Sequence, residues 1–206
     1  MKRITVFCGS SSGTDPIFYE QAKLLGCILA RNNIELVYGG AKVGLMGAVA
    51  DGVLNNGGKA IGVLPHFLKS SEIMHDSLTE LMLVETMHER KAKMNELCDG
   101  VIALPGGFGT LDEFFEMLTM AQLGLHKKPV ALLNVGGFYD PLLLLVDSMV
   151  KKGFLKEINR AMILISDTID DLLEQMKNYQ APQAGKWIMN SGDPDSNHFI
   201  MNHSSV

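Results

Sequence analysis

Residues 100–116 read GVIALPGGFGTLDEFFE: a short apolar run, a glycine-rich loop and the start of an acidic and aromatic segment. The run over 100–104 is typical of a buried strand, and the spacing that follows predicts a helix over about 110–122. Glycine lets a backbone turn tightly or approach a bound group closely. The stretch therefore predicts strand, loop and helix in direct succession, which is the repeating unit of a parallel sheet.

The same alternation continues in both directions from this stretch. A longer irregular connection is expected over 66–80, and no internal repeat is visible. Strands that are continuous apolar runs between helices indicate an α/β fold, with a doubly wound, Rossmann-like parallel sheet and helices on both faces. The other predicted strands are 2–8, 34–38, 59–64, 81–85, 129–134 and 162–165, and the other helices are 15–31, a segment ending near 55, 86–98, 139–152 and 170–179.

Length and composition limit the domain count and the classes of partner. A chain of 206 residues suits one domain, here 1–180, followed by a polar tail over 181–206 that is rich in Gly, Pro, Ser, Asn and His. The net charge is −5, which gives no basic footprint for a nucleic acid polymer or an anionic membrane. No apolar run approaches the ~20 residues that span a bilayer, and no secretory signal core is visible.

The cysteines and histidines give no metal or disulfide pattern. Cys8, Cys27 and Cys98 are scattered without CxxC spacing, which indicates buried, reduced thiols and a cytoplasmic location. The histidines lack the spacing of metal ligands. We therefore expect no metal site.

Three glycine-rich loops follow predicted strands, at 9–13, 39–47 and 106–109. The carboxyl ends of parallel strands share one edge, and backbone N–H groups of such loops, with the following helix N-termini, favour anions. Neither the dinucleotide fingerprint nor a P-loop is present. Each loop alone is explained by a tight turn, but three at one edge favour a phosphate or sugar ligand, with candidate contacts at Gly9, Ser10, Gly39, Gly40 and Gly44.

Acidic residues follow the third loop. Asp112 is explained by the helix dipole, which favours negative charge in the first turn. Glu113 and Glu116 lie three residues apart and share a helix face. A carboxylate one turn from a bound phosphate would lie near the sugar of a nucleotide, where it can orient water or stabilise positive charge at the anomeric carbon.

A basic segment, MHERKAKM over 87–94, lies in the predicted helix before the strand over 100–104. Arg90 and Lys91 point about 100° apart on a helix, so they need not share a role. Met87, Arg90 and Met94 share one face, which places a cation between two thioethers. The alternative is a solvated charged helix with a methionine core stripe.

The quoted stretch resembles a known signature. PGGFGTLDE, 105–113, is similar to the PGGxGTxxE motif of the LOG family, the cytokinin riboside 5'-monophosphate phosphoribohydrolases, often called lysine decarboxylase-like. The resemblance extends through MHERKAKM, GGAKVGLMG over 39–47 and LTMAQLGLHKKPVALLN over 118–134, and covers roughly 2–180. It implies a Rossmann-like homodimer that hydrolyses the N-glycosidic bond of AMP or N6-substituted AMP, without a metal or organic cofactor.

The resemblance also implies roles for individual residues. Arg90 and Glu113 correspond to the catalytic pair. Phe108 stands where many members have tyrosine, a change that keeps the ring. The residues implied in binding the purine nucleoside monophosphate are Glu72, Lys91, Gly107, Phe108, Gly109, Thr110, Leu111 and Thr119.

Two alternatives remain open from the residues. A non-catalytic nucleotide or cofactor carrier would share the glycine loops but would not need Arg90 and Glu113 at the sugar. A pyridoxal phosphate decarboxylase would need a Schiff-base lysine, and nothing singles one out. The apolar segment 117–125 fits either the core or a dimer face.

Overall fold

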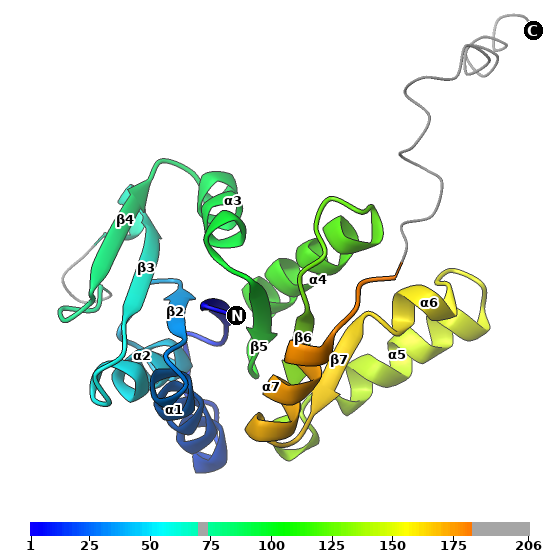
Figure 1. The fold of residues 1–206 in the computed structure, drawn as a ribbon, viewed down its shortest axis with the longest axis horizontal. Helices are drawn as coiled ribbons and strands as arrows, with labels where there is room; N and C mark the ends of the chain where they lie inside the picture. The colour runs from blue at the N-terminus through cyan, green and yellow to red at the C-terminus, as the bar shows by residue number, and fades with distance from the viewer. Residues whose placement is uncertain (70–73, 183–206) are drawn as a thin grey trace, which may run out of the picture.

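The computed structural model describes residues 1–69 and 74–182, which form a seven-stranded sheet (Figure 1). The strand order is β4-β3-β2-β1-β5-β6-β7, and every neighbouring pair is parallel. The predicted α/β, doubly wound class is confirmed. The strands are β1 (Arg3–Phe7), β2 (Glu35–Tyr38), β3 (Ala60–Pro65), β4 (Glu80–Val84), β5 (Gly100–Ala103), β6 (Val130–Leu133) and β7 (Ile163–Ser166).

Helices cover both faces of the sheet and enclose two apolar cores. Buried side chains of α1 (Pro16–Arg31), α2 (Gly44–Leu54) and α7 (Ile169–Asn178) pack in one core. Those of α3 (Met87–Leu97), α4 (Phe108–Gln122) and α5 (Asp140–Lys151) pack in the other. The sheet thus lies between two helical layers, which is why its strands are apolar on both sides.

The order in which the chain adds strands to the sheet reverses at β1. It moves outward from β1 through β2 and β3 to β4, and then returns to place β5 on the other side of β1. In Figure 1 the strands run from β4 on the left to β7 on the right, with α1 and α2 side by side below. The loops after β1 and β5 therefore leave the same edge at the switch point, where open α/β sheets bind ligands.

The elements differ from the sequence predictions mainly at their ends. The helix α4 begins at Phe108, two residues before the predicted start. Three short helices were not predicted: η1 (His66–Leu68), η2 (Val135–Gly137) and α6 (Glu157–Arg160). Glu72 and residues 183–206 lie outside the described residues, so the boundary at 180 stays a prediction.

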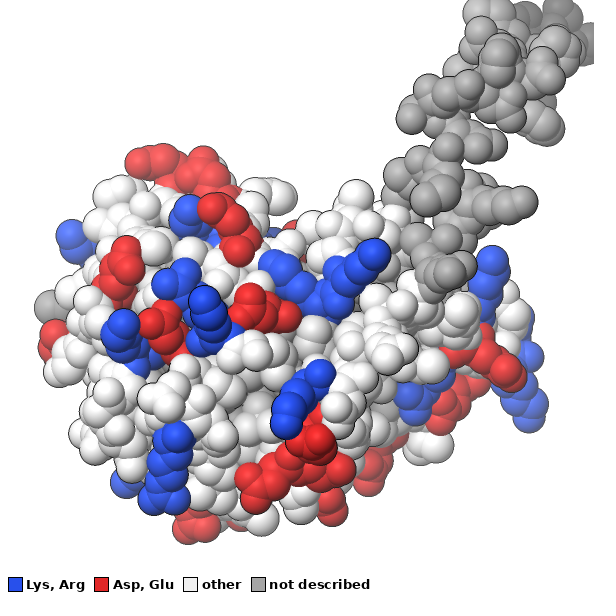
Figure 2. Space-filling view, in the orientation of Figure 1, with Lys and Arg blue, Asp and Glu red and all other residues white. Residues whose placement is uncertain are grey.

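The surface charge and the apolarity of the helices bear on the partners of this protein. Figure 2 shows basic and acidic side chains interspersed on the face that it presents. Over the described ranges, no helix combines the length and apolarity needed to cross a membrane.

Candidate active site

The loops after β1 and β5 contact each other directly. The Gly9 backbone N–H donates to the Pro105 carbonyl at 3.0 Å, and the Leu45 N–H at the start of α2 donates to the Gly9 carbonyl at 3.1 Å. A Cβ on Gly106 would lie 2.1 Å from Thr110 Oγ1, so only glycine permits this approach. Three segments distant in sequence are thereby joined at the switch point.

A cavity of about 290 Å³ opens beside these loops. This volume lies near the lower end of the range for small-molecule sites. Its walls come from the end of β1, the loops after β1, β2 and β5, and the helices α2, α3 and α4. Nine residues predicted for the site line it: Gly9, Ser10, Gly39, Arg90, Gly107, Phe108, Gly109, Thr110 and Glu113.

The N-terminus of α4 forms one wall of the cavity. Its N-cap is Gly107, which has no side chain to accept from the helix, so no side-chain hydrogen bond caps it. The first N–H groups of a helix lack partners within the helix, and with the dipole they attract anions. Phe108, at the first helical position, is 95% exposed at the mouth. The wall is thus suited to a phosphate group.

Glu113 lies on α4 within the same wall, and its side chain is only 12% exposed. Burial raises the pKa of Glu113 to about 7, and the charges of Asp112 and Glu116 act in the same direction. Arg90 and Lys91 oppose this rise. A carboxyl group with a pKa near the working pH can either accept or donate a proton.

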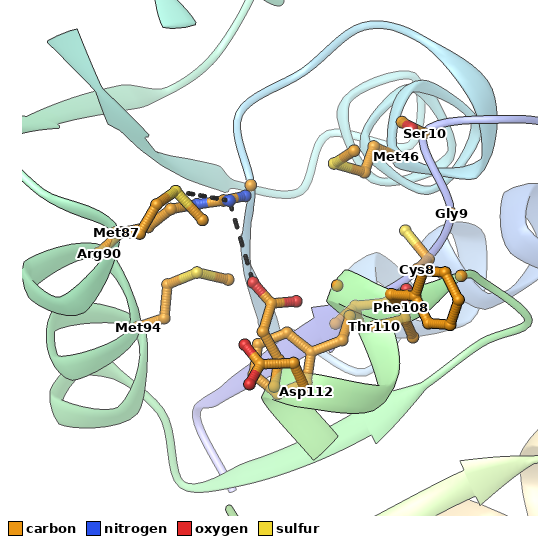
Figure 3. Close-up of a pocket in the computed structure, with 16 residues that line it drawn as sticks. Cys8, Gly9, Ser10, Met46, Met87, Arg90, Met94, Phe108, Thr110 and Asp112 are labelled. Atoms are coloured by element: carbon orange, nitrogen blue, oxygen red, sulfur yellow. Dashed lines mark hydrogen bonds and ion pairs between the residues drawn. The ribbon is translucent and has the colours of Figure 1, made fainter. Parts of the chain in front are cut away.

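Arg90 points from α3 into the cavity (Figure 3), where it pairs with Glu113. The start of α3 is fixed by Thr86, whose hydroxyl accepts from the Glu89 N–H at 3.1 Å. Arg90 Nε donates to the Val63 carbonyl at 3.0 Å, and Nη1 lies 3.9 Å from Glu113 Oε1. The Arg90 side chain, 11% exposed, is therefore directed by β3 toward the carboxylate.

Methionines and a glycine shape the guanidinium's position. Met87 Sδ lies 4.0 Å from Arg90 Nη1, and Met94 lines the same cavity, which confirms the predicted shared face. A Cβ on Gly39 would lie 2.1 Å from Arg90 Nη2. The backbone after β2 is thus as close to the guanidinium as glycine allows.

Other residues predicted for the site do not line this cavity. Lys91 pairs with Asp112 and Glu116, confirming that it diverges from Arg90. Leu111 packs against the core, and the exposed Thr119 donates its hydroxyl to the Phe115 carbonyl at 2.8 Å. Gly40 and Gly44 have positive φ angles of 79° and 58°. Gly40 thus shapes the loop after β2 and Gly44 the first residue of α2, both from outside the lining.

Cys8 and Met46 also line the cavity, although neither was predicted for the site. Cys8 ends the first strand run, directly before Gly9, and this position was the available signal. Burial raises the pKa of the Cys8 thiol well above its usual range, as does the charge of Glu113, while Arg90 lowers it. The thiol is therefore neutral at physiological pH.

The described residues offer no group of side chains for a metal site and no lysine in the cavity for a Schiff base. Within 1–69 and 74–182, no set of three or more His, Cys, Asp or Glu side chains is placed to hold a metal ion. No lysine lines the cavity among these same residues.

Comparison with known proteins identifies the family. The sequence model of a family described as "Possible lysine decarboxylase" matches residues 46–176. The "Probable cytokinin riboside 5'-monophosphate phosphoribohydrolase LOGL1" of Oryza sativa subsp. japonica is 49% identical over 177 residues, which cover 86% of this chain and 79% of that protein. This chain belongs to the LOG family.

Further relatives agree with this placement. The "Cytokinin riboside 5'-monophosphate phosphoribohydrolase LOG7" of Arabidopsis thaliana is 46% identical over 179 residues, which cover 87% of this LOG-family chain and 82% of the relative. Among solved structures, a molybdenum cofactor binding protein from Rippkaea orientalis superimposes with a TM-score of 0.66 at 24% identity, covering 86% of this chain and 96% of that one. At that identity the likeness concerns the fold alone.

Proposed function

We propose that this protein hydrolyses the N-glycosidic bond of adenosine 5'-monophosphates, plain or N6-substituted, to free base and ribose 5-phosphate. The observation that carries the proposal is the pairing of Arg90 and Glu113 at 3.9 Å, nearly buried, one turn from an uncapped helix N-terminus. LOG-family relatives named as phosphoribohydrolases support the same reaction.

The geometry suggests how the substrate is held. The 5'-phosphate binds at the N-terminus of α4, formed by Gly107, Phe108, Gly109 and Thr110, against the loop at Gly9 and Ser10. The ribose then lies over Glu113, one helical turn further on. The loop is glycine-rich because the backbone itself meets the phosphate, and α4 holds the carboxylate in place.

Glu113 and Arg90 have distinct roles in the proposed step. Ionised Glu113 stabilises the oxocarbenium-like transition state or accepts a proton from the attacking water. Arg90 orients the carboxylate and assists departure of the base. Its charge also opposes the cost of burying ionised Glu113, which keeps the pKa of that group near 7 rather than higher.

A chromatographic assay tests this function with AMP and N6-isopentenyl-AMP. Wild type should release free base, and Glu113→Gln should lose about 10²–10⁴-fold in rate. Glu174→Gln, on the exposed side of α7, is the control and should match wild type. Turnover by Glu113→Gln at the parental rate would refute the assignment, and nucleotide binding without base release by wild type would favour a carrier.

We also propose a homodimer in the cytoplasm. In the segment 117–125, Met117 and Ala121 are buried in the core, whereas Leu123 and Leu125 are 41% and 60% exposed. These two leucines are available to a second copy. The free state of Cys8, Cys27 and Cys98 suits a reducing compartment.

A further inference from the structure

A short segment between η1 and β4 is fastened to the loop after β2. An antiparallel bridge joins Met74 to Ala41. The His75 backbone N–H donates to the Gly40 carbonyl at 3.0 Å. The segment therefore supports this loop through its backbone, although the two lie more than thirty residues apart in the sequence.

The His75 side chain fastens the same segment to α2. The side chain is 8% exposed, and Nε2 lies 3.3 Å from Asp51 Oδ1 on that helix. Nδ1 accepts from the Ser77 backbone N–H at 3.2 Å, which places the ring proton of a neutral imidazole on Nε2, toward Asp51. Because the side chain is buried, both ring nitrogens need these partners.

The loop that His75 holds also meets the Arg90 guanidinium. A Cβ on Gly39 would lie 2.1 Å from Arg90 Nη2, so the backbone there is in direct contact with the guanidinium. The next residue, Gly40, has a φ angle of 79°, and its carbonyl is the acceptor for the His75 N–H. The contact with His75 and the contact with Arg90 are therefore one residue apart on the same loop.

We propose that His75 is a positioning residue, which holds the loop after β2 so that Gly39 sets the place of the Arg90 guanidinium. The pair with Asp51 anchors this support to α2. The positional part of the proposal stands without the proposed function. Its catalytic consequence rests on that function, in which Arg90 orients Glu113 and assists departure of the base.

Two conservative variants separate the contacts of the imidazole. In His75→Asn the side-chain oxygen takes the place of Nδ1 and still accepts from Ser77, but the side chain is too short to reach Asp51. In His75→Gln the amide nitrogen takes the place of Nε2 and still donates to Asp51. Because Arg90 is assigned to the transition state, His75→Asn should lose about tenfold in kcat for AMP with little change in KM. His75→Gln should keep most of the wild-type rate.

A double-mutant cycle tests whether the effect passes through Arg90. Arg90→Lys keeps a cation but has no Nη2 in contact with Gly39. In this background His75→Asn should therefore lower the residual kcat by about twofold or less. An equal loss in both backgrounds would overturn the proposal, because His75 would then act by another route, such as direct contact with the nucleotide.

Thr79→Val is the matched control for a general loss of stability. The Thr79 hydroxyl accepts from the Ala60 N–H at 3.1 Å, so it fastens the same segment to β3 rather than to the loop after β2. The variant should unfold at a lower denaturant concentration than wild type and yet keep the wild-type kcat. A loss of kcat as large as that of His75→Asn would contradict the positioning role.

The position of the guanidinium is measured independently of turnover. The Arg90 Nε–H, which donates to the Val63 carbonyl, is observed by ¹H–¹⁵N NMR and assigned by its absence from Arg90→Lys. Its resonance should shift in His75→Asn and stay near its wild-type position in His75→Gln and Thr79→Val. An unchanged Arg90 resonance in His75→Asn would overturn the proposal.

Asp51→Ala replaces His75→Asn in both measurements if the latter fails to fold, because it removes the acceptor of the same pair from its half-exposed side. An Asp51→Ala protein with wild-type kcat and an unchanged Arg90 resonance would then refute the role of the pair. If wild type releases no base from AMP, the proposed function fails, but the Arg90 resonance still tests the role of His75.

Discussion

At the scale of single residues, the energetics of the candidate site centre on Glu113. Its side chain is 12% exposed, and burial is the largest cause of the raised pKa. The protein therefore holds a group that is easier to protonate when folded than when unfolded. Because proton binding and folding are linked, the raised pKa of Glu113 affects the pH dependence of stability as well as catalysis.

Glu113→Gln should change the pH dependence of stability. Because the folded pKa of about 7 exceeds the unfolded value near 4.5, the contribution of Glu113 is full below pH 4.5 and is lost as pH rises through 7. Glutamine resembles the neutral acid and avoids this loss. The free energy of unfolding of the variant, relative to wild type, should increase by about 2–3 kcal/mol between pH 5 and pH 8.

Denaturant unfolding at both pH values measures this difference. Glu174→Gln replaces an exposed carboxylate on α7 and should show the same difference from wild type at both pH values. A Glu113→Gln difference that stays constant with pH would mean that the carboxyl group ionises normally in the folded protein.

At the scale of elements, the sequence predicted the strands well because their apolar runs are short and bounded. Each of the seven lies within two residues of its expected limits. The start of α4 was misplaced because Gly109, a poor helix former, occupies its second position. Short helices such as α6 (Glu157–Arg160) lack enough turns to show a period.

Part of the candidate site was predictable, because local sequence motifs mark it. Arg90 and Glu113 lie on helices that flank β5, so local motifs were enough to nominate them. Cys8 and Met46 were missed because their place in the wall depends on how the loop after β1 packs on α2, through the Leu45–Gly9 hydrogen bond. Such packing is not encoded in local periodicity.

Gly39→Ala should displace the Arg90 guanidinium. The added Cβ would lie 2.1 Å from Nη2 and 2.9 Å from Met46 Sδ, so the Arg90 side chain must move. We expect a loss of about 10²-fold in kcat/KM, the scale of a 1 Å misplacement, and a lower free energy of unfolding. The change acts on an element boundary, where the loop after β2 meets α3.

A double-mutant cycle isolates this clash. In the Arg90→Ala background the nearest remaining atom to the added methyl group is the flexible end of Met46, so Gly39→Ala should cost about 1–2 kcal/mol less there than in wild type. Equal costs measured by denaturant unfolding in the two backgrounds would show that the backbone, and not the guanidinium, requires glycine.

At the scale of the whole molecule, the site depends on the reversal of strand order at β1. The return from β4 to β5 brings α3 and α4 onto the same face, so their side chains meet over the end of β1. Arg90 lies on α3, which follows β4 on one side of β1, whereas the glycine loop follows β5 on the other side. The site therefore draws on segments from both sides of β1, and the two apolar cores hold these segments together.

The same architecture predicts the effect of shortening the chain to 1–182. The buried side chains of the two cores lie between Ile4 and Met176, and none of the described cavities is lined beyond Phe138. The shortened protein should keep wild-type turnover of AMP and a free energy of unfolding within about 0.5 kcal/mol of the full chain.

Met176→Ala in the full chain is the contrast, because it empties a fully packed position and should cost about 2–5 kcal/mol. Denaturant unfolding and the base-release assay decide between the two, and a 1–182 chain as destabilised as Met176→Ala would place residues 183–206 within the folded domain.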